Sequence, residues 1–273
     1  MRRALIDADI LLWEVSSCES YIDEDTKEVV LKAFEPLKEL MDQKIDEIVR
    51  RSGSTTYDLF ISGPNNFRYD IAKRKGYKAN RSGKEKPFHY DNLKAYLIAS
   101  HWAVVSDGIE ADDVICITQT AALADGRETV ICSRDKDLRQ CQGLHFSWEC
   151  GVQAEKETYE VKGFGTLVPH YNKLGKIDRL NGTGDKWFLA QLLMGDATDN
   201  IPGLKGYGPV KVYGLLSEDN VDCYERGLAV VRNEYLNKYE SSEEADKELE
   251  EQAHLVYMIR EANDDGSPKF WRW

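Results

Sequence analysis

Acidic residues gather in four short clusters within the first 200 residues of the chain, and each cluster lies where an element of structure is expected to begin or end. The clusters are Asp7 with Asp9, Glu110 with Asp112 and Asp113, Asp135 with Asp137, and Asp196 with Asp199. Carboxylates that lie close together repel one another and resist ionisation unless cations neutralise them. Hard oxygen ligands in this number suit magnesium or manganese, and no nearby set of histidines or cysteines favours zinc. The first hypothesis is therefore a divalent metal site.

The chemistry of such a site depends on how many ions it holds. Two ions roughly 4 Å apart activate a water molecule and stabilise the leaving oxygen in phosphodiester hydrolysis. Any one cluster alone is also what a helix cap, a turn or a solvated surface would show. The argument for phosphate chemistry therefore depends on all four clusters together.

The elements that must position these clusters alternate between strands and helices, which is typical of a mostly parallel sheet. We expect strands at 3–6, 57–61, 103–105 and 128–132, and helices at 29–51, 89–100 and 112–123. Shorter strands are expected at 144–148, 157–161 and 166–170, a loop at 175–184, and helices from Lys186 onward. In open α/β sheets, ligands bind beyond the carboxyl ends of the strands. Asp7, Glu110 and Asp135 fall at such positions.

Composition limits the class of protein. The 273 residues are 42% hydrophobic, enough for a real core, and the formal net charge of −12 argues against a protein that coats nucleic acid by bulk electrostatics. The six cysteines form no C-x-x-C pair, so zinc or disulfide frameworks are not expected. No apolar stretch approaches the roughly 20 residues of a membrane span, and no secretory signal is found. We expect a cytoplasmic protein without membrane contact.

The segment 67–87 is strongly basic within this acidic chain. Aromatic residues interleave the cations and could stack on unpaired bases, as in single-strand channels. The segment carries Arg68, Lys73, Arg74, Lys75, Lys78, Arg81, Lys84 and Lys86 against Asp70 and Glu85, a balance of eight minus two, or +6.

A glycine-rich stretch follows the fourth carboxylate cluster. Gly203, Gly206 and Gly208 surround a tight turn between helix-forming stretches, with Lys205 and Lys211 beside it. Backbone N–H groups in such a turn, together with an adjoining helix N-terminus, can hold a DNA phosphate. A simple helical turn is the alternative.

Together these motifs resemble the 5′-nuclease superfamily, which includes flap endonucleases, the 5′-nuclease domain of bacterial DNA polymerase I and phage exonucleases. The chain most resembles the exonuclease of short-tailed coliphages. The motifs, in chain order, are Leu5-Ile-Asp7-Ala-Asp9, Tyr77-Lys-Ala-Asn-Arg81, Gly108-Ile-Glu110-Ala-Asp112-Asp113, Ser133-Arg-Asp135-Lys-Asp137, and Gly195-Asp196-Ala-Thr-Asp199 with the glycine-rich stretch up to Gly208.

The resemblance implies an α/β, PIN-like fold with a mostly parallel sheet flanked by helices. It implies a catalytic core over residues 1–190 with a helical arch at about 67–100. A helical region for duplex DNA follows over 191–273, with a helix-hairpin-helix element at about 200–215.

The resemblance also implies roles for individual residues. Asp7, Glu110 and Asp112 are expected to bind a first Mg²⁺ or Mn²⁺ ion, and Asp113, Asp135, Asp137, Asp196 and Asp199 a second. Lys78 and Arg81 are expected at the scissile phosphate, where fixed cations stabilise developing charge. The expected DNA contacts are Arg68, Lys73, Lys75 and Tyr77 in the arch, and Gly203, Lys205, Gly206, Gly208 and Lys211 in the hairpin element, where K⁺ can bridge to DNA.

One departure from the family pattern concerns the first metal site. Many members carry another metal-binding aspartate soon after the second strand, but here the sequence reads Phe60-Ile-Ser62-Gly63-Pro64. We hypothesise that Asp9 partly replaces the missing ligand.

The sequence therefore predicts a metal-dependent 5′ to 3′ exonuclease acting on duplex DNA, with water as nucleophile. RNA primers in RNA:DNA hybrids and short flaps are expected further substrates, and phage DNA replication or recombination the setting. A structure-specific flap endonuclease is the first alternative, and an RNA-cutting PIN-type nuclease the second. A non-catalytic DNA-binding relative with a weakened metal site is the third.

Overall fold

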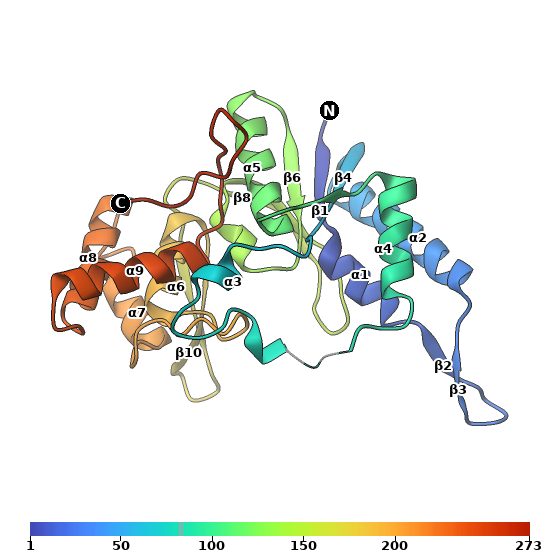
Figure 1. Ribbon diagram of the computed structural model, residues 1–273, viewed down its shortest axis with the longest axis horizontal. Helices are drawn as coiled ribbons and strands as arrows, with labels where there is room; N and C mark the ends of the chain where they lie inside the picture. Colours follow the sequence, from blue (N-terminus) through green and yellow to red (C-terminus); the bar gives the residue numbers. More distant parts are fainter. Residues whose placement is uncertain (82, 84) are drawn as a thin grey trace. The chain divides into compact units, whose positions relative to one another are not determined.

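The computed structural model describes residues 1–81, 83 and 85–273 (Figure 1), so Lys84 of the basic segment lies outside the described residues. The chain forms two compact units, which are described separately. The first consists of Met1–Asn65, Gly83–Arg134 and Gly143–Tyr159, and the second of Asn66–Ser82, Asp135–Gln142 and Glu160–Trp273. The predicted domain boundary near residue 190 falls inside helix α6 (Gly184–Met194) of the second unit.

The first unit is built on a sheet with the strand order β5-β4-β1-β6-β7-β8. Its strands are β1 (Arg3–Asp7), β4 (Thr56–Ile61), β5 (Val104–Val105), β6 (Thr129–Cys132), β7 (Gly143–Ser147) and β8 (Lys156–Val161). β1 pairs in parallel with both β4 and β6, β4 with β5, and β6 with β7. The prediction of an α/β fold with a mostly parallel sheet is confirmed.

Helices cover both faces of this sheet because alternate residues of a strand point to opposite sides. Ala4 and Ile6 of β1 share a buried cluster with residues of α1 (Ala8–Ser16), α2 (Phe34–Arg51) and α4 (Tyr90–His101). Helix α5 (Ala111–Ala124) contacts β1, β4 and β6 but contributes nothing to that cluster, so it covers the other face. Figure 1 shows α5 and α1 on either side of β1.

Two element predictions need correction. The predicted helix at 29–51 begins only at Phe34, because the β-branched run Val29–Leu31 forms strand β3, which pairs with β2 (Ser20–Ile22). Pro36 lies in the first turn of α2, where its missing N–H has no intrahelical partner to lose. The predicted loop at 175–184 contains strand β10 (Ile177–Gly182), which pairs with β9 (Leu167–Tyr171).

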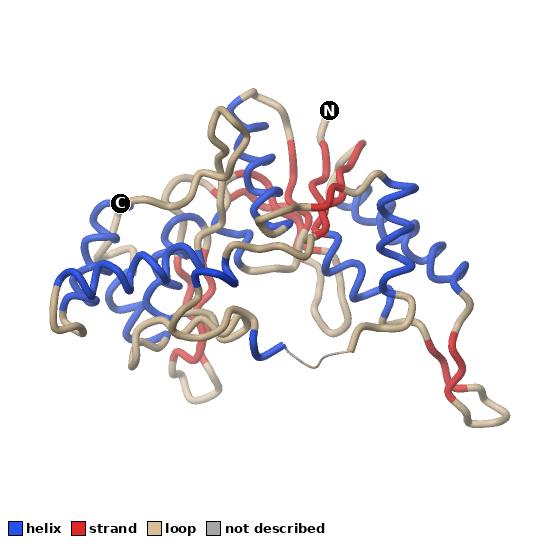
Figure 2. The backbone as a smooth tube through the Cα atoms, viewed as in Figure 1, coloured by secondary structure: helices blue, strands red, loops and turns tan. Residues whose placement is uncertain are grey.

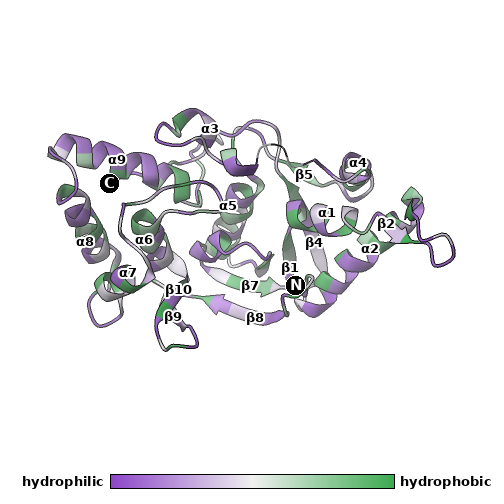
Figure 3. Ribbon diagram, turned by 90° about the horizontal axis from the view of Figure 1, so that it is seen from below, coloured by the Kyte–Doolittle hydropathy of each residue, from purple (hydrophilic) through white to green (hydrophobic). Residues whose placement is uncertain are grey.

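The second unit packs helices around α6. Helix α6 is buried along nearly its whole length and contacts its neighbours on several sides, as expected for a helix that is apolar all round. Figure 2 shows the helical character of this unit, and Figure 3 shows that most residues of α9 are hydrophilic. The other helices are α7 (Pro209–Leu216), α8 (Tyr224–Leu236) and α9 (Ser242–Val256), with the short turns α3 (Arg68–Ile71), η1 (Ala79–Arg81) and η2 (Asp137–Gln140).

The segment predicted as a helical arch contains α3 and η1 in the second unit and α4 in the first. Residues 72–78, between α3 and η1, are not helical. Among the described residues, no helix is long and apolar enough to cross a membrane.

Candidate active site

Asp7 lies at the carboxyl end of β1 in the first unit and caps helix α1. Asp7 is 3% exposed; its Oδ1 accepts a hydrogen bond from the backbone N–H of Ile10 at 3.5 Å, and its Oδ2 accepts one from Ser133 Oγ at 2.7 Å. Aspartate is a favoured cap because its oxygen satisfies a free N–H of the first helical turn. The carboxylate is thereby fixed at the sheet edge where ligands bind in open α/β folds.

Asp9 and Lys94 hold the backbone of Ser62, the residue beside the missing family carboxylate. Asp9 Oδ2 accepts a hydrogen bond from the N–H of Ser62 at 3.0 Å, and Lys94 Nζ donates to the carbonyl oxygen of Ser62 at 3.0 Å. Burial raises the pKa of Asp9, although the hydrogen bonds from Ser62 and the charge of Lys94 favour its ionised form. Asp9, Ser62 and Lys94 all belong to the first unit.

Gly63, which follows Ser62, has no room for a side chain. A Cβ atom on Gly63 would lie 2.0 Å from the backbone oxygen of Ser106, and the N–H of Gly63 donates to Ser106 Oγ at 3.3 Å. The chain passes too close to Ser106 for any side chain. The hypothesis that Asp9 replaces the missing ligand stays a prediction.

The second carboxylate cluster opens helix α5. Glu110 and Asp113 form a capping box in which each side chain accepts a hydrogen bond from the other residue's backbone N–H, at 3.1 Å for Asp113 Oδ2. Ser62 Oγ accepts from the N–H of Ala111 at 3.0 Å. Asp113 is fully buried, whereas Asp112 is partly exposed. The structure gives Asp113 a capping role in the first unit, where the sequence predicted a ligand of the second ion.

The third cluster lies in the second unit. Asp135 Oδ1 accepts a hydrogen bond from the backbone N–H of Asp137 at 2.8 Å, which fixes the short turn η2. Asp137 Oδ1 accepts one from Gln191 Nε2 of helix α6 at 2.6 Å. Burial, helped by the charge of Asp135, raises the pKa of Asp137 to about 8.

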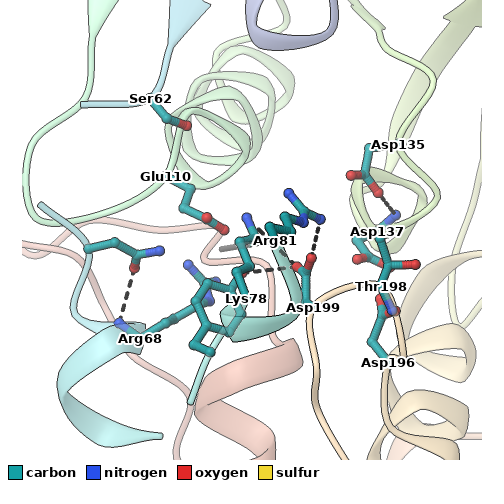
Figure 4. A network of polar contacts seen from close by, with 12 residues as sticks. Ser62, Arg68, Lys78, Arg81, Glu110, Asp135, Asp137, Asp196, Thr198 and Asp199 are labelled. Carbon is teal, nitrogen blue, oxygen red and sulfur yellow. Dashed lines mark hydrogen bonds and ion pairs between the residues drawn. The ribbon is translucent and has the colours of Figure 1, made fainter. Parts of the chain in front are cut away.

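Lys136 lies between the third and fourth clusters. Its Nζ is 3.0 Å from Asp137 Oδ1 and also forms an ion pair with Asp196 Oδ2. Although burial opposes it, the Lys136 ammonium holds the pKa of Asp196 below its usual range. The backbone N–H of Thr198 donates to Asp196 Oδ1 at 2.8 Å (Figure 4). An internal cation therefore neutralises the acidic group within the second unit.

Asp199 binds the two cations predicted to hold the scissile phosphate. Its carboxylate accepts a hydrogen bond from Tyr77 Oη at 3.0 Å, forms an ion pair with the guanidinium of Arg81, and lies 3.7 Å from Lys78 Nζ. Figure 4 shows Lys78 and Arg81 directed toward Asp199. The fourth cluster and the basic pair thus meet within one unit.

Hydrogen bonds to backbone carbonyl oxygens also hold residues 76–81 of the basic segment against residues 196–200. The N–H of Lys78 donates to the carbonyl oxygen of Asp199 at 2.9 Å, and Lys78 has a left-handed backbone with φ of 52°. Asn80 Nδ2 donates to the carbonyl oxygen of Ala197 at 3.0 Å, and Asn200 Nδ2 to that of Gly76 at 2.9 Å. Residues 76–81 and 196–200 therefore form one docked pair of loops.

Two residues predicted to contact DNA are structural. Arg68 is 0% exposed, and its guanidinium donates to the backbone oxygen of Leu255 at 3.1 Å and to that of Tyr257 at 2.8 Å. Tyr77 is 4% exposed and belongs to the core of the second unit. Neither side chain is available to a nucleic acid in this arrangement. By contrast, Lys73 and Lys75 are exposed, and their contacts with DNA stay a prediction.

The glycine-rich stretch divides into a packed part and an open part. A Cβ atom on Gly203, which has φ of +59°, would lie 2.3 Å from the N atom of Gly195, so Gly203 is needed for close packing. Nothing lies within 4 Å of a Cβ on Gly206 or Gly208. Gly208 is the N-cap of α7, and Lys205 and Lys211 are exposed.

Sequence reasoning missed three residues of these groups, namely Lys94, Lys136 and Gln191. The position of Lys136 between two predicted metal ligands, Asp135 and Asp137, could have indicated its role. Lys94 and Gln191 carried no such indication, because only the fold brings them to Ser62 and Asp137.

The donor set of both units consists of hard carboxylate oxygens, which suits magnesium or manganese. Within the described part of the chain, no three carboxylate, imidazole or thiol groups are gathered around a common point as a metal cage. The second unit instead neutralises its carboxylates with Lys136, Lys78 and Arg81.

Comparison with known proteins adds family information. The profile of the 5′-3′ exonuclease N-terminal resolvase-like domain matches residues 25–164, about half of the chain. The chain is 30% identical over 171 residues to DNA polymerase I of Bacillus subtilis, which covers 60% of the chain and 18% of that protein. It is 30% identical over 126 residues to flap endonuclease Xni of Shewanella piezotolerans, 46% of the chain and 44% of the relative. The chain thus spans less than half the length of these relatives.

Solved structures show the same fold. A bacteriophage T5 flap endonuclease, crystallised as a pseudo-enzyme-product complex with DNA and metal ions, aligns with a TM-score of 0.57 at 14% identity, over 97% of this chain and 95% of that one. A T5 5′-exonuclease with bound zinc aligns with a TM-score of 0.54 at 14% identity, over 92% and 88%.

Proposed function

Because the chain belongs to the 5′-3′ exonuclease family defined by its N-terminal resolvase-like domain, we propose that it hydrolyses phosphodiester bonds at the 5′ ends of duplex DNA with divalent metal ions. The observation that carries the proposal is the docking of the basic pair Lys78 and Arg81 onto Asp199, a member of the fourth carboxylate cluster. Carboxylates for metal ions and cations for a phosphate are thus organised by one pair of loops.

The metal ligands follow from the two acidic groups. We assign Asp7, Glu110 and Asp112 to one ion, and Asp135, Asp137, Asp196 and Asp199 to another. Mg²⁺ or Mn²⁺ fits these oxygen donors. When bound, such ions supply a water nucleophile at neutral pH and stabilise the charge of the leaving oxygen.

The chain's own residues prepare these groups. Ser133 and the first turn of α1 orient Asp7, and Gln191 orients Asp137. Lys136 keeps the second group neutralised until an ion replaces it. Once Asp199 binds an ion, Arg81 and Lys78 would turn from its carboxylate to a phosphate, where fixed cations stabilise the developing negative charge.

Duplex DNA is the proposed substrate. Exposed Lys73 and Lys75 would contact the strand that carries the 5′ end, and the open turn of Gly206 and Gly208 with Lys205 and Lys211 would hold a duplex phosphate, with K⁺ as bridge. RNA primers in RNA:DNA hybrids and short flaps are proposed further substrates, in phage replication or recombination. The residues from 191 onward are proposed as the duplex-binding region.

A second candidate is a structure-specific flap endonuclease. The likeness to relatives named flap endonuclease favours it. Such an enzyme would cut internally at the base of a flap, so its first labelled product is an oligonucleotide, whereas an exonuclease releases mononucleotides from a 5′ label.

The test is digestion of 5′-labelled blunt, flapped and RNA-primed duplexes with Mg²⁺ and with EDTA. We expect metal-dependent release of mononucleotides, and loss of cleavage in the Asp135→Ala, Asp137→Ala double variant. The Asp178→Ala variant is the control, because that exposed carboxylate pairs with His170 in the β9–β10 hairpin, apart from the four carboxylate clusters. Metal-dependent DNA binding without cleavage on every substrate would instead identify a non-catalytic relative with a weakened first metal site.

A further inference from the structure

A cavity in the second unit lies against the C-terminal segment, apart in sequence from all four carboxylate clusters. Its volume is about 590 Å³, within the range typical of small-molecule sites. Arg260, Tyr224, Tyr257, Phe270 and Trp271 line it, together with Lys269. Three of its lining side chains are cationic and two acidic, in a chain whose net charge is −12.

The informative feature of this cavity is Arg260. Its Nη1 donates to Asp185 Oδ1 at 2.6 Å, and its guanidinium lies 5.2 Å from the centre of the Tyr257 ring. Its Nε and Nη2 are buried and have no hydrogen-bond partner among the residues that the structure describes. A buried polar group without a partner costs free energy, and more so when it is charged.

Nε and Nη2 together form the edge of the guanidinium that binds two oxygens at once. The same chain shows what that edge does elsewhere: Arg232 Nε and Nη2 hold the two carboxylate oxygens of Asp246, each at 2.7 Å. On Arg260 the equivalent edge is unused. A carboxylate or phosphate is the group that fits such a fork.

The aromatic walls of the cavity favour a phosphate that is joined to a planar base over a carboxylate. Trp271 is 5% exposed and its Nε1 donates to Tyr224 Oη at 2.8 Å, so this aromatic side of the cavity is rigidly built. Aromatic faces beside a guanidinium suit a planar base joined to a phosphate, because bases stack on aromatic rings whatever their identity. Lys269, which pairs with Glu261, adds a cation at the rim.

Another part of the lining is a short turn, Glu261 to Lys269, whose backbone is held by its own hydrogen bonds. The N–H of Lys269 donates to the carbonyl oxygen of Glu261 at 2.9 Å, and the N–H of Asn263 to that of Ser267 at 2.8 Å. The C-terminal segment from Tyr257 to Trp273 contains no helix and no strand longer than an isolated bridge. Because Nε and Nη2 of Arg260 are buried in this arrangement, a ligand that binds them must displace this turn.

We propose that this cavity binds a 5′-phosphorylated nucleotide, with the phosphate on the Nε and Nη2 edge of Arg260 and the base against Tyr224 and Trp271. Either a free mononucleotide or the phosphorylated end of a DNA strand carries this chemistry. The site is independent of the proposed nuclease activity, since none of its residues belongs to the acidic clusters or to the basic segment.

Titration calorimetry in EDTA tests the proposal, because chelation removes any metal-dependent phosphate binding. The probes are deoxyadenosine 5′-monophosphate, deoxyadenosine, inorganic phosphate, an acidic peptide and a 5′-phosphorylated oligonucleotide of twelve residues. We expect the monophosphate to bind more tightly than inorganic phosphate, and deoxyadenosine and the peptide not to bind. Equal binding of deoxyadenosine, or binding of the peptide in place of the nucleotide, would overturn it.

The decisive variant is Arg260→Lys, which keeps the charge beside Asp185 but removes the fork. We expect at least a tenfold loss of nucleotide affinity, while Arg226→Lys, on the exposed surface of α8, leaves it unchanged. Lys269→Gln, a rim change that leaves the core untouched, should weaken binding several-fold and keeps the test open if Arg260→Lys fails to fold. Unchanged affinity in both Arg260→Lys and Lys269→Gln, or no nucleotide binding to the unaltered protein, would overturn the site.

The oligonucleotide distinguishes the two sources of the phosphate. If it binds as tightly as the mononucleotide and depends equally on Arg260, the site holds a strand end. If only the mononucleotide depends on Arg260, the site holds a free product or effector. Retention of nucleotide binding in the Asp135→Ala, Asp137→Ala variant separates this site from the failure or success of the proposed nuclease function.

Discussion

The carboxylate of Asp199 is ion-paired with the guanidinium of Arg81. Sequence reasoning assigned the first residue to a metal ion and the second to a phosphate, yet they neutralise each other. Tyr77 and Lys78 bind the same carboxylate. A metal ion that takes Asp199 must therefore release cations of the basic segment, which links metal binding to the freedom of residues 76–81.

That linkage predicts the behaviour of Asp199→Asn. The amide keeps the shape of the side chain but loses the charge that holds Arg81 and Lys78, which removes charge-assisted bonds of on the order of 1.5–3 kcal/mol. We expect faster trypsin cleavage after Lys75, Lys78 and Arg81 in EDTA, followed by mass spectrometry. Asp178→Asn, which alters an exposed pair with His170, is the control and should leave these cleavage rates unchanged. Equal cleavage of the two variants would show that backbone contacts alone hold the segment.

Lys136 should compete with metal ions for Asp137 and Asp196. Replacing it by methionine removes the internal cation, so the metal-free protein should be less stable and Mg²⁺ should stabilise it more. Removing one nearby like charge changes ion affinity by roughly tenfold, about 1.4 kcal/mol, at a protein surface. Thermal unfolding in EDTA and across a Mg²⁺ titration measures both effects. The control is Lys162→Met, which removes an exposed partner of Glu160 and should change neither the stability nor the Mg²⁺ affinity. A Lys136→Met protein that binds Mg²⁺ no better than the unaltered chain would contradict this account.

The glycine-rich stretch predicts opposite outcomes for two glycines. Gly203→Ala places a Cβ 2.3 Å from the backbone N of Gly195 in a left-handed conformation, so unfolding in urea should show a loss of several kcal/mol, as expected for overpacking with backbone strain. Gly208→Ala meets nothing within 4 Å and should cost about 1 kcal/mol or less, as at other helix caps. If the open turn binds DNA, a bulky residue at Gly208 lowers duplex affinity while the protein stays folded. Unchanged duplex affinity in such a folded variant would remove the turn from the DNA-binding surface.

The pair between Arg232 of α8 and Asp246 of α9 predicts a pH dependence. The hydrogen bonds from Arg232 lower the pKa of Asp246 below its ordinary value of 3.8. A carboxyl group whose pKa falls on folding contributes stability above its unfolded pKa, and that contribution is lost as the pH falls through the folded value. Urea unfolding of the unaltered protein and of Asp246→Asn should therefore differ slightly at pH 7, and the difference should shrink as the pH is lowered below 3.8. A difference that does not shrink would mean that the variant acts through packing and not through charge.

Local patterns sufficed for the elements that position Asp7, Glu110 and Asp135. A short apolar run ending in aspartate predicts β1 and its ligand edge, and an acidic residue before an apolar helix predicts the start of α5. These signals lie within a few residues of one another. The strands and helices they define are therefore readable without the fold.

The sequence did not indicate which residues are buried by segments far away in the chain. Arg68 lies in a basic run that suggests an exposed surface, but its partners are carbonyl oxygens nearly two hundred residues later in the chain. No local pattern reports that a guanidinium will be covered by a distant helix end. The same holds for Gln191 on Asp137, and for β10, whose polar sequence becomes a strand only because β9 supplies hydrogen-bond partners.

The interleaving of the two units has a consequence for biosynthesis. The six-stranded sheet can be completed once Val161 has emerged, whereas Arg68 can donate to Leu255 and Tyr257 only after those residues have been made. Contacts so far apart in sequence form late, because the loop that joins them must close first. During translation the guanidinium of Arg68 therefore stays in water until the last part of the chain is made, and a chain that ends before residue 255 lacks these two contacts of the second unit.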